Sequence, residues 1–128
     1  MLLNKHFSLS EAHAILHKTI ITLSNISSLK KKLEDSGYNI YRHQYFGGIG
    51  PNGTGKFPEN LEELIKLLHS LSEKGIIIKN IEEGLIDFPH IRENGEEVYL
   101  CYLMGEDDIE YWHSINGGFA GRRSIEYL

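Results

Sequence analysis

The feature that most constrains this chain is an amphipathic pattern that continues without glycine or proline over residues 9–35. Its apolar residues recur at spacings of three, four and seven, which places them on one stripe of a single helix. Ser8 and Glu11 match a capping box before the pattern, and Gly37 suits the left-handed position after a helix end. A helix of this length extends about 40 Å, so the remaining chain covers it fully only if another element pairs with it. The stripe consists of Leu9, Ala12, Leu16, Leu23, Ile26 and Leu33, with interruptions at Thr19 and Lys30.

A second amphipathic helix is predicted over residues 59–74, between Pro58 and Gly75. Two long amphipathic helices joined by one connection favour an antiparallel helical hairpin. The connection, residues 38–58, is a glycine-rich loop, and the role of its residues 47–56 is open. The apolar stripe of the second helix consists of Leu61, Leu64, Ile65, Leu68 and Leu71.

The glycine-rich loop contains an imitation of a nucleotide-binding motif. Gly50, Gly55 and Lys56 have the spacing of a P-loop, but Phe57 stands where Ser or Thr should hold magnesium. No buried strand precedes the motif, and the chain lacks the parallel sheet on which such enzymes depend. We therefore expect a simple glycine turn and no nucleotide hydrolysis at Lys56.

Residues 76–104 predict a small, mainly antiparallel three-stranded sheet, with strands at 76–79, 85–88 and 98–104. The Asn94-Gly95 pair marks a hairpin between the last two strands. Residues 4–8 are a candidate fourth strand at the edge. The fold class is α+β, with the helical hairpin packed on the sheet. In the last strand Tyr99, Cys101 and Leu103 share one face, while Val98, Leu100, Tyr102 and Met104 share the other.

The C-terminal segment, residues 105–128, shows less regular patterning. Both faces of the last predicted strand are largely apolar, so we expect the strand to be central and covered on both sides. The helices should cover one face and the C-terminal segment the other. Residues 106–113 are expected to form a short helix or a turn, and residues 114–128 to be irregular.

Composition bounds the class of protein. The formal net charge of −5 argues against wholesale binding of nucleic acid, which uses a basic face. A single cysteine, Cys101, cannot form an internal disulfide, and this fits the reducing cytoplasm. No stretch resembles a signal peptide or approaches the roughly 18 apolar residues of a membrane span. We expect one cytoplasmic domain over residues 1–128, without a membrane partner.

Five motifs carry a family resemblance: FSLSEAHAIL near the start, then GLIDFP, VYLCYLMGE, IEYWH and GFAGR. With these motifs in this order, the chain resembles the uncharacterised prokaryotic family called domain of unknown function 2203. The resemblance covers both predicted helices and residues 75–123, but not the glycine-rich loop. It implies a long helical hairpin with a small sheet, and it implies no particular reaction.

Asp87 lies inside the apolar strand LIDFP, where a buried carboxylate needs a partner. We predict Arg122, in the bend GFAGR, as that partner. The pair then either ties the C-terminal segment to the sheet or forms part of a ligand pocket. The predicted ligand-binding residues are Asp87, Tyr102, Trp112 and Arg122.

Glu106, Glu110 and His113 would lie on one face if residues 106–113 were helical. Glu110 and His113 then have the spacing of a metal-binding Glu-x-x-His pair, although one pair alone is not a metal site. The alternative for His113 is an ordinary hydrogen-bonded histidine beside a buried Trp112. Cys101 is expected to be an inert thiol of the strand.

Three functions remain open. The favoured hypothesis is a non-catalytic interaction or small-ligand-binding module with a pocket near the sheet and the C-terminal segment. A homodimer through the helix at residues 9–35 would use the apolar stripe that the chain leaves uncovered. The second hypothesis is a small enzyme in which His113, Asp87 and Glu106 perform acid–base chemistry and Arg122 holds an anion. The third is a metal-binding protein that uses Glu110 and His113. The sequence does not define a cofactor.

Overall fold

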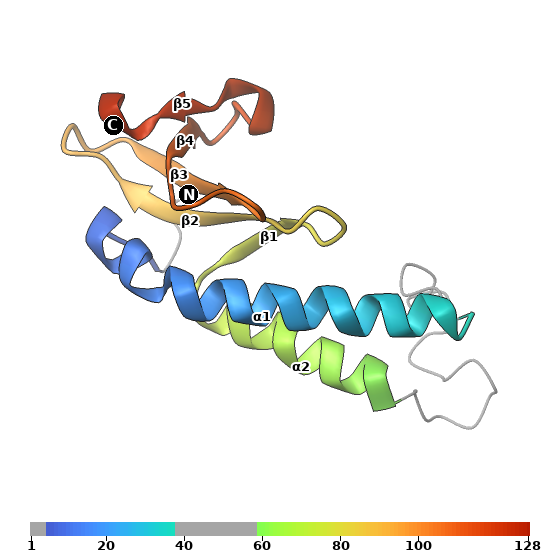
Figure 1. Ribbon diagram of the computed structural model, residues 1–128. Coiled ribbons are helices and arrows are strands. Elements are labelled where there is room, and N and C mark those ends of the chain that lie inside the picture. Colours follow the sequence, from blue (N-terminus) through green and yellow to red (C-terminus); the bar gives the residue numbers. More distant parts are fainter. Residues whose placement is uncertain (1–4, 38–58) are drawn as a thin grey trace.

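The computed structural model describes residues 5–37 and 59–128 and shows two packed helices against a five-stranded antiparallel sheet (Figure 1). The fold is therefore α+β, as predicted. Residues 1–4 and the glycine-rich loop at residues 38–58 lie outside the described residues. The same is true of the P-loop imitation at Gly50–Lys56 and of residue 4 of the candidate edge strand. Within the described ranges no helix is long and apolar enough to cross a membrane.

Helix α1 spans Leu9–Asp35 and begins with the predicted capping box between Ser8 and Glu11. Its buried stripe is more complete than the sequence suggested, because Thr19 and Lys30 are buried as well. The Thr19 hydroxyl donates to the Ile15 carbonyl oxygen at 2.8 Å. Lys30 forms ion pairs with Glu34 of the same helix and with Glu82, which follows β1. Paired in this way, a lysine fits into the stripe without interrupting its burial.

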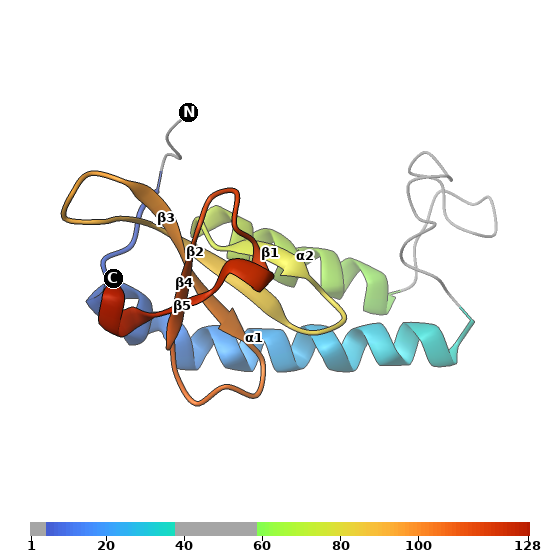
Figure 2. The same ribbon diagram turned by 90° about the horizontal axis from the view of Figure 1, so that it is seen from above.

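Helix α2 spans Glu59–Glu73 and runs antiparallel beside α1 (Figure 2). Two residues after its end stands Gly75, whose φ of +90° belongs to the left-handed region that glycine adopts readily. The chain then enters the sheet directly. Gly75 also lies against the N-terminal segment, since a Cβ added there would stand 2.6 Å from Cγ of Lys5.

The sheet contains more strands than the three predicted, and they follow one another in the order β1-β2-β3-β4-β5. The prediction of a helix or turn at residues 106–113 is wrong for its last part, because residues 111–114 form a strand. Tyr and Trp favour strands, and here that preference prevails over the helical spacing of Glu106, Glu110 and His113. The prediction of an irregular segment at residues 114–128 is wrong in part, because it contains a strand at Arg123–Ser124 and two short 3-10 helices. No strand forms at residues 5–8, although the Phe7 amide donates to the Pro89 carbonyl oxygen at 2.7 Å. The strands are β1 at Ile77–Asn80, β2 at Leu85–Ile91, β3 at Glu97–Leu103, β4 at Tyr111–Ser114 and β5 at Arg123–Ser124.

The two faces of the sheet differ sharply in character. The face toward the helices is apolar and joins their buried stripes in one core. The opposite face, which we call the outer face, carries Asp87, Tyr99, Cys101 and His113. Figure 1 shows the C-terminal segment on the side of the sheet away from the helices. The alternation predicted for β3 is thus consistent with the structure. The core side is formed by Ile86, Phe88, Val98, Leu100, Tyr102 and Trp112.

Candidate functional site

The outer face contains a buried pair between Asp87 of β2 and His113 of β4. Nε2 of His113 lies 3.1 Å from both carboxylate oxygens of Asp87, and Nδ1 lies 2.7 Å from the carbonyl oxygen of Ser114. Both ring nitrogens therefore face acceptors, which favours the doubly protonated ring. Burial lowers the pKa of His113, but the hydrogen bonds to Asp87 and Ser114 outweigh it and leave the pKa raised.

Cys101 of β3 is the third member of this group. It stands directly opposite Asp87 in the β2–β3 pairing, and it is 1 % exposed. Burial and then the negative charge of Asp87 raise the pKa of the Cys101 thiol to about 12, against a lowering effect of Arg122. One potential ligand atom from each of Asp87, Cys101 and His113 lies within 4.8 Å of the others. We call these three residues the outer-face triad.

A second, partly buried pair joins Arg122 to Glu106 beside the triad. Nη2 of Arg122 donates to the two oxygens of Glu106 at 2.8 and 2.6 Å, and the Leu103 amide donates to the first of them at 2.7 Å. The guanidinium lies 3.9 Å from the centre of the Tyr111 ring, within reach of a cation–π interaction. Nε of Arg122 is buried and has no hydrogen-bond partner among the described residues.

The ion pair predicted between Asp87 and Arg122 is wrong. Each of these residues is paired with another of the predicted candidates: Asp87 with His113, and Arg122 with Glu106. The predicted acid–base residues nevertheless lie near one another, because Asp87 and Glu106 both act on the Cys101 thiol and His113 bonds Asp87. The sequence placed Asp87 on a strand correctly, but His113 could not be placed while β4 was unrecognised.

Three other candidates lie away from this cluster. Glu110 is exposed and precedes β4, so the helical spacing that would align it with His113 does not exist. Trp112 and Tyr102 point into the core on the helix side, opposite to Asp87. The polar atoms of both side chains already have hydrogen-bond partners. Nε1 of Trp112 donates to the carbonyl oxygen of Ser124, and the Tyr102 hydroxyl donates to the carbonyl oxygen of Glu106. The predicted ligand-binding set is therefore divided between the two faces of the sheet.

The motifs named from the sequence converge on this cluster: GLIDFP supplies β2, VYLCYLMGE supplies β3, IEYWH supplies β4, and GFAGR contains Arg122. The chain also matches, over residues 5–125, a family described as uncharacterized conserved protein (DUF2203). The chain belongs to the DUF2203 family. No curated protein and no solved structure matches this DUF2203 chain. Its chemistry therefore has to be inferred from its own side chains.

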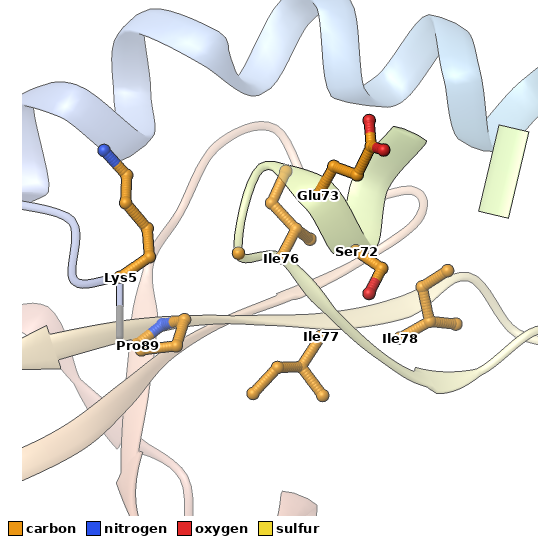
Figure 3. A pocket seen from close by; sticks show the side chains of 8 residues that line it. Lys5, Ser72, Glu73, Ile76, Ile77, Ile78 and Pro89 are labelled. Atoms are coloured by element: carbon orange, nitrogen blue, oxygen red, sulfur yellow. The ribbon is translucent and has the colours of Figure 1, made fainter. Parts of the chain in front are cut away.

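The DUF2203 chain also has a hollow of about 570 Å³ beside β1 (Figure 3). The pocket is mainly apolar, and β1, at the end of the strand order, forms one of its walls. Figure 3 shows the charged ends of Lys5 and Glu73 on the side of the strand that faces the helices. None of the predicted catalytic, ligand-binding or metal-binding residues lines this hollow, which we call the β1 groove. Its lining is Lys5, Ser72, Glu73, Gly75, Ile76, Ile77, Ile78 and Pro89.

Proposed function

We propose that this DUF2203 protein is a non-catalytic binding module that takes up an extended polypeptide segment in the β1 groove. The observation that carries this proposal is the coincidence of an apolar hollow with the edge of a sheet. Strand β1 pairs with β2 on one side, and no described strand pairs with its other side. Edge backbone groups that point away from the sheet are ready to pair with another chain.

The chemistry of the groove favours a polypeptide over a small apolar ligand. A ligand without amide groups could fill the hollow beside Ile77 and Ile78, but it would leave the edge groups of β1 without partners. An added strand satisfies these groups and places alternate side chains against the apolar lining.

The strand itself limits how long the bound segment is. Strand β1 has only four residues, its register shifts between Ile78 and Asn80, and it carries Lys79. Short length, irregular register and lysine are features that protect edges from continuous pairing. The proposal is therefore a short segment with apolar residues at alternate positions, bound reversibly.

The expected homodimer through α1 stays an untested prediction. The apolar stripe that was expected to remain uncovered on α1 is buried against α2 and the sheet, which weakens the case for this dimer. On α1 the large apolar side chain that remains exposed is Ile21, and on α2 it is Ile65. These two residues are the ones that such a dimer would use.

A small enzyme is the second candidate function. The hydrogen bond between His113 and Asp87 favours it, because a carboxylate commonly orients a histidine that acts as a general base. Both side chains are buried, at 3 % and 0 % exposure. A substrate would reach them only if the structure around them opened.

Hydrogen exchange tests the binding proposal. Peptides selected from a displayed library of extended segments should slow amide exchange in β1, and the Ile77→Lys variant should lose at least tenfold in affinity, which corresponds to about 1.4 kcal/mol. Ile21→Lys is the matched control, since it places the same charge on an exposed apolar position of α1.

A protein lacking residues 1–4 shows whether the segment before Lys5 competes for the groove. Equal binding to Ile77→Lys and the parent protein would refute the proposal, and light scattering shows whether a second copy is the occupant.

A further inference from the structure

The outer-face triad brings a carboxylate, a thiol and an imidazole together from three successive strands. Asp87 and Cys101 are direct partners across β2 and β3, and His113 reaches over from β4. All three side chains are at least nine-tenths buried. We propose that Asp87, Cys101 and His113 form a binding site for a divalent transition-metal ion of the zinc type. No residue of the triad lines the β1 groove, although Ile77 of the groove stands opposite Asp87 in the β1–β2 pairing.

The distances fit a site that needs only a small contraction. The potential ligand atoms lie within 4.8 Å of one another. Oxygen, nitrogen and sulfur ligands at about 2.0–2.3 Å from a tetrahedral zinc ion lie roughly 3.3–3.8 Å apart. Rotation of the Cys101 and Asp87 side chains can supply a difference of about an ångström without moving the strands.

The position of the His113 ring is the one that metal-binding histidines adopt. Its Nδ1 donates to the Ser114 carbonyl oxygen, which fixes the ring and leaves Nε2 facing Asp87 and Cys101. Ligating histidines usually donate their second ring N–H to such a carbonyl group. The metal ion would replace the Nε2 proton and the thiol proton, so binding releases protons.

The donor set selects among metals. A thiolate and an imidazole favour zinc, cobalt or similar ions, whereas calcium and magnesium prefer oxygen ligands alone. Three protein ligands leave one tetrahedral position open. The nearby carboxylate of Glu106 is held by Arg122 and by the Leu103 amide. The burial of the triad limits the fourth ligand to water or an ion of similar size.

Cobalt substitution tests the site directly. The reduced protein, purified without a histidine tag and treated with chelator, should bind one equivalent of Co²⁺. Binding should give visible d–d bands and a near-ultraviolet thiolate-to-metal band, and zinc should abolish both. Cys101→Ser should remove the near-ultraviolet band, and Asp87→Asn should weaken binding by more than the roughly 10–100-fold that loss of an outer-shell partner costs.

The controls separate this site from adventitious binding. Glu110→Gln removes the other carboxylate considered for His113, and His69→Gln removes an exposed histidine paired with Glu73. Both variants should bind cobalt as the parent protein does. Circular dichroism establishes that Cys101→Ser, a nearly isosteric change, is folded. If the parent protein gives no thiolate-to-metal band with excess cobalt, or if Cys101→Ser gives the same spectrum, the proposed site is refuted.

Discussion

Nε2 of His113 bonds the Asp87 carboxylate across an entire intervening strand. The two residues belong to β4 and β2, and β3 lies between them, yet both Nε2–oxygen distances are 3.1 Å. The contact runs diagonally over β3, because Asp87 stands opposite Cys101 whereas His113 stands opposite Tyr99. The pair therefore connects strands that share no backbone hydrogen bonds.

The buried pair gives the metal-free protein a defined dependence on pH. The pKa of His113 is raised above its ordinary value of 6.5, so the folded state holds the proton more tightly than the unfolded state. The stabilisation is fully present below pH 6.5 and is lost as the pH rises through the folded-state pKa. The free energy of unfolding, measured in urea with chelator present, should therefore decline over that range. Asp87→Asn should reduce this pH dependence. It should also lower the free energy of unfolding by about 3 kcal/mol, as expected when one member of a buried pair is removed. An unchanged pH dependence in this variant would contradict the assignment of the effect to the pair of His113 and Asp87.

The Cys101 thiol should be inert in the folded, metal-free protein. Its pKa of about 12 and its burial mean that almost no accessible thiolate exists near pH 8. A disulfide reagent should label it slowly in buffer and rapidly in denaturant, with a folded-state rate that follows the opening of the structure. Rapid labelling of the folded protein would show that the C-terminal segment exposes the outer face.

Gly75 should be sensitive to substitution. Its φ is +90°, and an added Cβ would stand 2.6 Å from Lys5 Cγ. Gly75→Ala should lower the free energy of unfolding by roughly 1–2 kcal/mol through the left-handed backbone alone. Gly121→Ala is the matched control, since Gly121 has no positive φ and no atom within 4 Å of its added Cβ. Similar losses at both positions would contradict this explanation.

The helices were predictable from the sequence because their signals are local. The capping box at Ser8 and Glu11, the stripe at spacings of three and four, and Gly75 after α2 lie within a few residues of the elements that they define. The burial of Lys30 was missed because its partner Glu82 comes from the turn after β1. Such a contact becomes visible only when the elements are placed in space.

The residues of the candidate site could be predicted from the sequence, but the partner of each charged side chain could not. Asp87, Glu106, His113 and Arg122 were each recognised as polar groups near apolar strands or tight bends. Their partners depend on β4, a strand of four residues that carries no turn signal as strong as Asn94-Gly95. Cys101 was assigned to the correct face of β3, but its proximity to His113 depends on the same pairing.

The order of the strands in the sheet follows their order along the chain. In such a meander each strand attaches to the one synthesised just before it. Asp87 and Cys101 can face each other once β3 has paired, but His113 joins them only after β4 has been added. A nascent or truncated chain that stops before residue 111 would thus display the carboxylate and the thiol without the imidazole. The outer-face triad is therefore complete only after β4 has been synthesised and has paired with β3.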